Sequence, residues 1–231
     1  MPFLDVENKR LFYARVDAET TSKVPGPVLV FIHGLGSSHS FYMPVMGQLA
    51  AAGYSSVALD VYGSGLSELS PGIESPTFDT IACDVEGLLT GLNIRPEDAV
   101  AVGHSMGGVV VPKLASKCSL RGAVLIGPVL PKAALADVFN TRIETVRKDG
   151  MEPMAKTIPF AATGSKSTLT QKAFIRALLL SQKPEGYIAL CQAIAKADLP
   201  SYSSIKCPLL ILAGEEDKTS PVPDAKKILN E

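Results

Sequence analysis

The sequence predicts an α/β protein in which a mostly parallel sheet carries helices on both faces. Two observations predict this class. Short apolar runs without polar alternation recur along the chain, as in parallel strands that are covered on both sides. Segments with helical periodicity separate most of these runs, and strand–helix–strand repetition produces right-handed crossovers. The 231 residues, of which 46% are hydrophobic and 19% charged, suffice for one well-packed core.

The strands are predicted in order along the chain. Residues 11–16 follow a polar turn at residues 8–9, which indicates an early hairpin. Five short apolar runs then predict the strands of the parallel sheet, at residues 28–32, 56–59, 99–102, 123–126 and 209–212.

The helices at first alternate with these strands. Apolar spacing predicts one helix over residues 41–52, which stops at Gly53. A second helix follows residue 74, with Ser75 as its N-cap and Pro76 as its first helical residue. After the strand at 209–212, we expect a last helix that begins at Asp224.

The alternation breaks between residues 131 and 200, where the pattern is helical throughout. Three apolar stripes predict three helices in this stretch, at residues 135–150, 169–180 and 187–197. A helical block between two sheet strands predicts a cap over the carboxyl ends of the strands, where pockets form in open α/β sheets. We therefore expect a core of residues 1–130 and 201–231 and a helical cap of residues 131–200.

The motif with the clearest chemistry is Gly103-His104-Ser105-Met106-Gly107. It lies between an apolar strand and a helix, which is the context of a nucleophile elbow. A strained turn there exposes the Ser105 hydroxyl above the sheet, and glycines at 103 and 107 allow the close approach of strand and helix.

Two further loops offer groups that would work with such a serine. His33-Gly34-Leu35-Gly36 follows the strand at 28–32, so that the backbone N–H of Leu35, together with that of Met106, can stabilise a developing oxyanion. Gly214-Glu215-Glu216-Asp217 follows the strand at 209–212. An acid there would orient a histidine and stabilise its charged form. Asp217 is our first candidate for this role, and Glu216 is its rival.

Together these motifs resemble the α/β-hydrolase fold family, in particular its capped esterase and lactonase branch, which includes proteins similar to 3-oxoadipate enol-lactonase. The resemblance spans residues 11–229, with Tyr62 in place of the arginine that the family usually has in the loop after its second parallel strand. It implies that Ser105 is the nucleophile, Asp217 the acid, and Leu35 and Met106 the oxyanion donors. It also implies that neither a metal nor an organic cofactor is needed.

The histidine that such a site normally uses is not in the expected place. In the family it follows the strand after the acid, whereas here the sequence reaches only Glu231 beyond Asp217. A crossover with its helix takes at least about 10–12 residues. We therefore expect a chain cut within an element, which lacks the last strand, its histidine loop and the final helix. The run Leu209–Leu212 would then form a sheet edge, which favours self-association.

Only three histidines are available as substitutes. His33 belongs to the oxyanion loop and is assigned a structural role. The side chain of His104 is expected to point away from that of Ser105. His39, just beyond the oxyanion loop, is the one plausible stand-in for the base.

Composition limits the partners. The formal net charge is −1, with 22 basic and 23 acidic residues, so that nothing points to nucleic acid or an anionic membrane. Four cysteines match no zinc or redox spacing, and no apolar run reaches the ~18 residues of a spanning helix. With charged residues close to Met1, the start does not resemble a signal peptide. We expect a cytoplasmic protein with free thiols.

These observations predict a serine hydrolase of small carboxylic esters or lactones that forms an acyl-enzyme on Ser105 and is impaired by the lack of a histidine base. The alternative is a protein that binds a small ligand without catalysis, as a sensor or receptor. Other chemistry on the same fold, such as cofactor-free oxygenation, has no residue in its favour. Cap side chains such as Phe139, Phe160 and Tyr187 are expected to set the specificity.

Overall fold

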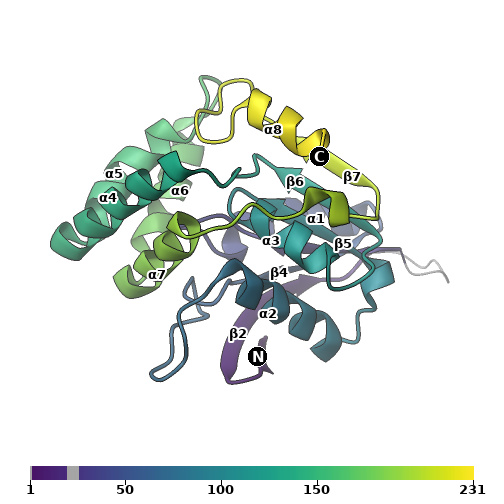
Figure 1. Ribbon diagram of the computed structural model, residues 1–231. Coiled ribbons are helices and arrows are strands. Elements are labelled where there is room, and N and C mark those ends of the chain that lie inside the picture. Colours follow the sequence, from purple (N-terminus) through teal and green to yellow (C-terminus); the bar gives the residue numbers. More distant parts are fainter. Residues whose placement is uncertain (1, 20–25) are drawn as a thin grey trace.

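The computed structural model describes residues 2–19 and 26–231 (Figure 1). Within them, seven strands form one sheet in the order β1-β2-β4-β3-β5-β6-β7. β1 pairs antiparallel with β2, β2 pairs antiparallel with β4, and the remaining neighbours are parallel. The predicted hairpin and the mostly parallel sheet are confirmed. The strands are β1 (Phe3–Val6), β2 (Lys9–Val16), β3 (Val28–Ile32), β4 (Ser55–Leu59), β5 (Ala99–His104), β6 (Gly122–Ile126) and β7 (Leu209–Leu212).

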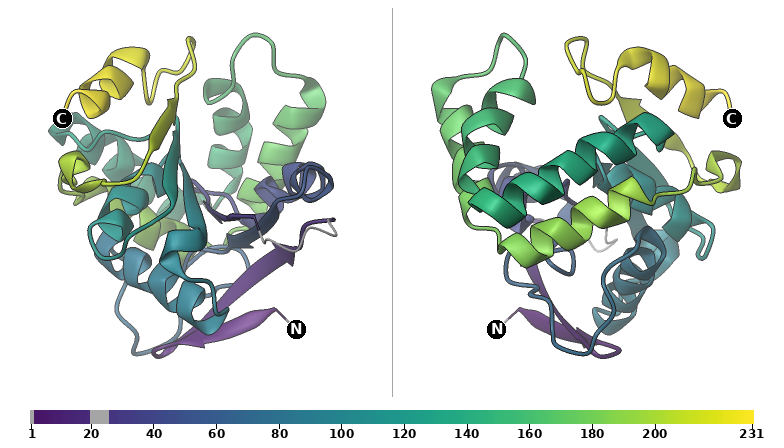
Figure 2. Two further views of the ribbon diagram at one scale, coloured as in Figure 1. Left: turned by 90° about the vertical axis from the view of Figure 1, so that its right-hand side faces the viewer. Right: turned by 60° about the vertical axis from the view of Figure 1, so that its left-hand side comes forward.

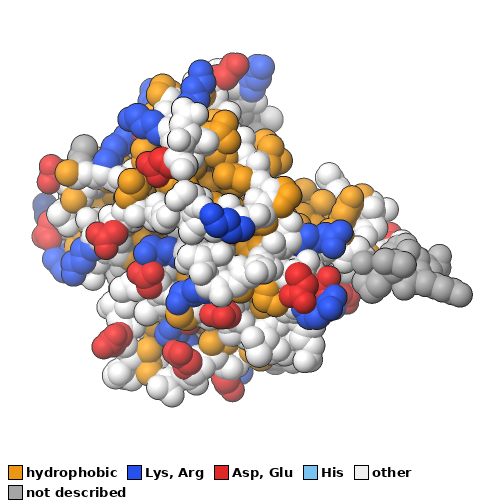
Figure 3. Space-filling view, turned by 45° about the vertical axis from the view of Figure 1, so that its right-hand side comes forward, with side chains coloured by type: hydrophobic (Ala, Val, Ile, Leu, Met, Phe, Trp, Pro, Cys, Tyr) orange, Lys and Arg blue, Asp and Glu red, His pale blue; other side chains and the backbone are white. Residues whose placement is uncertain are grey.

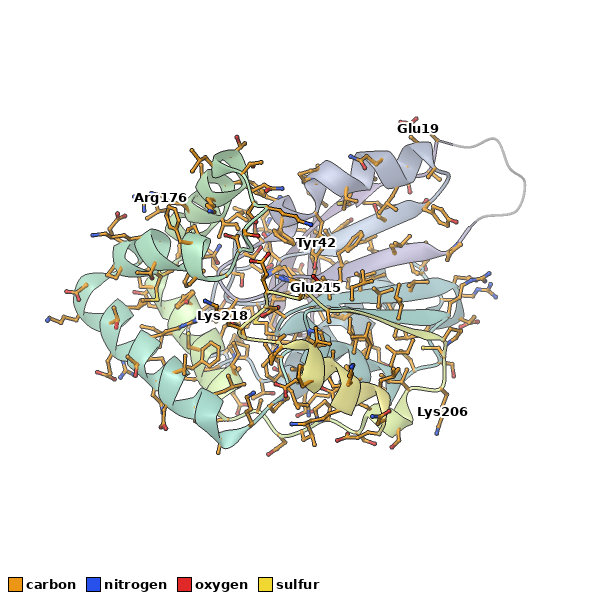
Figure 4. All side chains as sticks on the ribbon, turned by 90° about the horizontal axis from the view of Figure 1, so that it is seen from above. Glu19, Tyr42, Arg176, Lys206, Glu215 and Lys218 are labelled. Atoms are coloured by element: carbon orange, nitrogen blue, oxygen red, sulfur yellow. The ribbon has the colours of Figure 1, made fainter. Side chains whose placement is uncertain are left out.

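Helices cover both faces of this sheet, as predicted. On one face, α1 (Met43–Ala51) and the preceding 3₁₀ turn (His39–Phe41) pack against a cluster that includes Phe31, Tyr42 and Met46. The larger cluster on the other face is covered by α2 (Phe78–Gly91), α3 (Gly107–Ala115) and α8 (Val222–Leu229). Figure 4 shows α1 and α8 on opposite sides of the sheet. Because both faces are covered, the central strands are apolar on both sides.

The start of α2 differs from the expectation. Thr77, and not Ser75, is the N-cap, and the first helical residue is Phe78. The Thr80 amide donates to the Thr77 hydroxyl at 3.1 Å, and the Thr80 hydroxyl accepts from the Thr77 amide at 2.9 Å. This reciprocal capping box satisfies two N–H groups, which Ser75 cannot match because Phe78 would be its N3 residue. The last helix, α8, likewise begins earlier than predicted, at Val222 instead of Asp224.

The stretch between β6 and β7 contains four α-helices and not three, and a short 3₁₀ helix (Tyr202–Ser204) follows them. They are α4 (Ala133–Asp149), α5 (Glu152–Ala161), α6 (Leu169–Leu180) and α7 (Pro184–Ala195). The unpredicted α5 contains Pro153 at its first turn, where proline is tolerated, and Pro159 inside the helix, where proline removes a backbone hydrogen bond. In Figures 1 and 2 these helices lie together at one end of the sheet. The division into a core (1–130 and 201–231) and a cap (131–200) stays a prediction.

Strand β7 forms one edge of the described sheet. Leu210 and Leu212 are 52% and 48% exposed, so that about half of each apolar side chain meets solvent. Hydrophobic side chains stand among charged ones on the face seen in Figure 3, which is turned towards the β7 end of the molecule. Among the described helices, none combines the length and apolarity needed to cross a membrane.

Candidate active site

Ser105 occupies a strained turn between β5 and α3. Its φ of +53° lies in the left-handed region, which costs a residue with a side chain about 1–2 kcal/mol. Neighbouring backbone holds it there: the Ser105 amide donates to the Ile126 carbonyl at 2.9 Å, and the Ser105 carbonyl accepts from Gly108 at 2.9 Å and Val129 at 3.2 Å. This is the strand–turn–helix geometry that the motif predicts.

Three glycines permit the close contacts around this turn. A Cβ atom at Gly103 would overlap the carbonyl group of Gly107, and one at Gly107 would overlap the carbonyl of Ile32. A Cβ atom at Gly34 would lie 3.0 Å from both the Ser105 Cβ and the His104 Nδ1. The loop after β3 therefore packs directly against the serine, with little room for a side chain at Gly34 and none at Gly103 or Gly107.

His33 orients that loop. Its Nε2 accepts a hydrogen bond from the Val61 amide at 3.0 Å, so its Nδ1 carries the hydrogen and donates to the Gly34 carbonyl at 2.8 Å. Burial lowers the pKa of His33, which keeps the ring neutral. Since the Gly34 carbonyl and the Leu35 N–H belong to one planar peptide, this bond turns the Leu35 N–H in the opposite direction. His33 thus has a structural role, as expected.

The two predicted oxyanion donors are free to bind. No backbone acceptor in the described part of the chain takes the hydrogen of the Leu35 or the Met106 amide. Met106 directly precedes α3, at a helix N-terminus where N–H groups point outwards. Two such donors beside one serine can stabilise negative charge on a carbonyl oxygen.

Asp217 and Glu216 separate in the loop after β7. The Asp217 Oδ1 accepts from the amides of Thr219 and Ser220, both at 2.8 Å. Glu216 instead binds the cap, where its oxygens accept from the amide and the hydroxyl of Ser165 at 2.9 and 2.7 Å. These bonds hold the pKa of Glu216 below its usual value. Glu216 is therefore occupied elsewhere, and Asp217 is the acid that reaches the site. Figure 4 labels Glu215 and Lys218 on the same loop, beside the cap.

Ser105, Leu35 and Asp217 line one cavity of about 390 Å³ between the sheet and the helices α4–α7. Of the three cap side chains expected to set specificity, Phe139 lines it, whereas Phe160 is 64% exposed and Tyr187 is buried outside the lining. The cavity is also lined by Arg142 of α4, which no motif singled out. The only feature of the sequence that could have placed Arg142 in the cavity is its position three residues after Phe139, on the same helix face.

The structure does not place His39 beside the nucleophile. Its Nδ1 lies 2.9 Å from the buried Asp60 carboxylate, and its Nε2 lies 3.3 Å from the Ser40 hydroxyl. Both ring nitrogens are engaged away from the cavity, and His39 is not among the lining residues. The idea that His39 substitutes for the base is therefore not supported by its position.

His104 lies differently from the expectation that it points away. It lines the same cavity as Ser105, and its ring stacks on Phe41 with centroids 5.1 Å apart. Burial lowers its pKa to about 4, and within the described chain its Nδ1 has no hydrogen-bond partner. No histidine among the described residues hydrogen-bonds to Asp217 or Ser105. Groups of three or more His, Cys, Asp or Glu that could hold a metal are likewise absent from residues 2–19 and 26–231.

The strained serine, the paired amides and the acid after the last strand define a protein with the α/β-hydrolase fold. The family model described as "Serine aminopeptidase, S33" matches residues 23–231, and the chain belongs to this hydrolase family.

Individual relatives agree with this assignment. The chain is 27% identical over 212 residues to 3-oxoadipate enol-lactonase 2 of Acinetobacter baylyi. The aligned region covers 90% of this chain and 78% of that protein. The chain is 28% identical over 215 residues to the non-heme chloroperoxidase CPO-A1 of Kitasatospora aureofaciens, with 85% and 76% covered. Among solved structures, the enol-lactonase of Burkholderia xenovorans matches with a TM-score of 0.86 and 25% identity over 99% of this chain and 87% of that one.

Proposed function

We propose that this protein is a serine hydrolase of small carboxylic esters or lactones, and that Ser105 carries the acyl group. The observation that supports this most strongly is the left-handed turn at Ser105, which lies in one cavity with Asp217 and the Leu35 loop. Strain of this kind persists only where surrounding structure holds it, and it concentrates at functional sites. The enol-lactonase relatives agree with the substrate class.

The reaction would proceed in two steps. The Ser105 oxygen attacks the carbonyl carbon, while the amides of Leu35 and Met106 stabilise the negative oxygen of the tetrahedral intermediate. The leaving alcohol departs with a proton and leaves an ester of Ser105. Water then attacks this acyl-enzyme and releases the acid. In a lactone, the alcohol and the acid are parts of one product.

Among the described residues, this site lacks an effective general base for Ser105. Serine is a poor nucleophile without an adjacent base, and His104, with a pKa of about 4, is a weak proton acceptor. We therefore propose that the residues described here support only slow turnover. Oxyanion stabilisation and binding alone still give roughly 10³–10⁴-fold acceleration over water.

Labelling with a fluorophosphonate probe tests the assignment, with added imidazole as an external base. We expect the probe on Ser105, at a rate that increases with imidazole concentration, and no label at this position in Ser105→Ala. Folding of the variant is checked by its thermal unfolding. If the native protein is labelled no faster than the variant at any imidazole concentration, Ser105 is not a nucleophile.

A binding protein without catalysis is the second candidate, since no described histidine hydrogen-bonds to Asp217 or Ser105. It predicts that an ester stabilises the protein against heat while no product forms, even with imidazole. Product formation on Ser105 would decide for the hydrolase.

Two further proposals concern the setting of the protein. We propose self-association through the exposed edge Leu209–Leu212, because unpaired N–H and C=O groups beside apolar side chains favour strand pairing. Light scattering that gives a monomer at all concentrations would refute this.

We also propose a reducing, cytoplasmic location, which agrees with four free cysteines. Ligands other than a small ester or lactone, including nucleic acid and membranes, are not part of this proposal.

A further inference from the structure

We propose that Cys118 and Cys207 form a redox site, in which a small anionic disulfide of the glutathione class oxidises the two thiols to an intramolecular disulfide. This bond would tie the end of α3 to the start of β7. Both cysteines lie outside the cavity of Ser105, so the site is independent of the proposed function.

The two cysteines reach one cavity from neighbouring segments. Cys118 belongs to the turn after α3, where its amide donates to the Leu114 carbonyl at 3.1 Å. Cys207 stands two residues before Leu209, which begins β7 and pairs with Ala123 of β6. Since β6 and β7 run parallel, Cys207 lies beside the segment that leads from Cys118 into β6. Both cysteines line the same cavity of about 340 Å³.

Both thiols are free and half-buried. The Cys118 thiol makes only a long hydrogen bond, 3.5 Å from its Sγ to the Leu114 carbonyl, so little is lost when its hydrogen leaves. Burial, and after it the negative charges of Glu86 and Cys207, raises the pKa of Cys118 to about 11. A charge on one sulfur therefore acts on the other, and thiolates of Cys118 are scarce at pH 7, which makes the exchange slow there.

The charges around the cavity favour an anionic oxidant. Lys117 and Lys206 line it next to the two cysteines, and none of its described lining residues is acidic. Both lysines are exposed, and in the described part of the chain neither forms an ion pair. Figure 4 shows Lys206 at the end of the molecule that is far from the cap helices. A disulfide that carries carboxylates, such as oxidised glutathione, is therefore attracted to this end.

The oxidation is a double thiol–disulfide exchange. One protein thiolate attacks a sulfur of oxidised glutathione, which gives a mixed disulfide and releases one glutathione thiol. The second protein thiolate attacks the protein sulfur of the mixed disulfide and releases the second glutathione. The protein loses two hydrogens and two electrons, and two molecules of glutathione carry them away. Reduced glutathione reverses both steps, as expected of a redox-sensing pair in a reducing compartment.

The bond would also stabilise the fold. It joins residues 118 and 207 and so closes a loop that contains β6 and the four cap helices α4–α7. Closing a long loop restricts the unfolded chain much more than the folded one. The folded state gains a restraint on β7, which is an edge strand of the described sheet.

The experiment incubates the purified protein with oxidised glutathione at about pH 8.5, where more thiolate is present, and then blocks the remaining thiols with iodoacetamide. We expect the protein to lose two hydrogens, and peptide mapping to find residues 118 and 207 in one disulfide. In Cys118→Ser and in Cys207→Ser, the reaction should stop at the mixed disulfide, with one glutathione on the remaining thiol of the pair. Cys83→Ser is the matched control, because Cys83 is likewise free and half-buried but lies on α2, outside this cavity, and it should leave the bond intact.

Thermal unfolding provides a second readout. We expect the oxidised protein to unfold at a Tm about 5–15 °C above that of the reduced protein, and dithiothreitol to remove this rise. Two results would overturn the proposal. One is oxidation of the native protein that ends at mixed disulfides on Cys118 and Cys207. The other is a disulfide that links either of them to Cys83 or Cys191 as readily as to each other.

Discussion

The left-handed backbone at Ser105 predicts an unusual order of stability for two substitutions at this position. Ser105→Ala and Ser105→Gly both remove the hydroxyl, so they differ only in the Cβ atom. At φ +53° an alanine bears about 1–2 kcal/mol of strain that glycine does not. Glycine loses about 0.4–1 kcal/mol more through the entropy of its unfolded chain. The difference leaves Ser105→Gly more stable than Ser105→Ala by about 1 kcal/mol.

Thermal and urea unfolding measure this difference. For a chain of this size, about 1 kcal/mol corresponds to a rise of roughly 2–4 °C in Tm. Ser116, at the end of α3, is the matched control because its φ of −75° is ordinary helical backbone. There the order should invert, with Ser116→Gly less stable than Ser116→Ala. If Ser105→Gly is equal to or less stable than Ser105→Ala, the elbow is not strained, and the reasoning that assigns the nucleophile fails.

Three further predictions concern charged and titrating groups. Lys9 and Asp84 form a buried ion pair of 2.6 Å, so Lys9→Met should lower the free energy of unfolding, measured in urea, by about 3–5 kcal/mol. A second substitution in the same protein, Asp84→Leu, should recover most of this loss. Because burial lowers the pKa of His104 from 6.5 to about 4, the free energy of unfolding should fall by at most about 3 kcal/mol as the pH drops from 6.5 to about 4. His104→Asn should flatten the curve of unfolding free energy against pH. An unchanged curve would contradict the lowered pKa. The hydrogen bonds from Ser165 lower the pKa of Glu216, so this contact stabilises the folded protein above the ordinary pKa of a glutamate, and the stabilisation is lost as the pH falls through the lowered value. Amide hydrogen exchange at Ser165 should therefore be faster in Glu216→Ala than in the native protein at pH 7. Equal exchange rates would rule the contact out.

Much of the fold could be predicted because its signals are local. Every strand of the parallel sheet lies within a few residues of the apolar run that predicts it, and for the central strands burial on both faces demands such a run. The errors occur where two local signals compete. Ser75 is an acceptable N-cap, but Thr77 has a partner at N3 and replaces it. Helix α5 was missed because its two prolines weaken the helical pattern.

The same distinction applies to the candidate site, where residues placed by local contacts could be predicted and residues placed by distant contacts could not. The elbow could be found because Gly103, Ser105 and Gly107 meet in one turn, where steric contact acts between near neighbours in the chain. His39 could not be judged from sequence, because its partner Asp60 comes from another loop. The choice of Asp217 over Glu216 likewise depended on Ser165, which belongs to the cap.

By itself, the sequence determined the order of the strands and of all the α-helices but α5, the strained turn at Ser105 and the loop that brings Leu35 to it. These follow from periodicity and from the space that glycine leaves, which act over a few residues. Only the tertiary structure decided that Arg142 and His104 share the cavity with Ser105, and that His39 does not. The placement of Arg142 beside Ser105 and of His39 beside Asp60 joins separate segments of the chain, and the packing that brings them together leaves no mark in the local pattern of either segment.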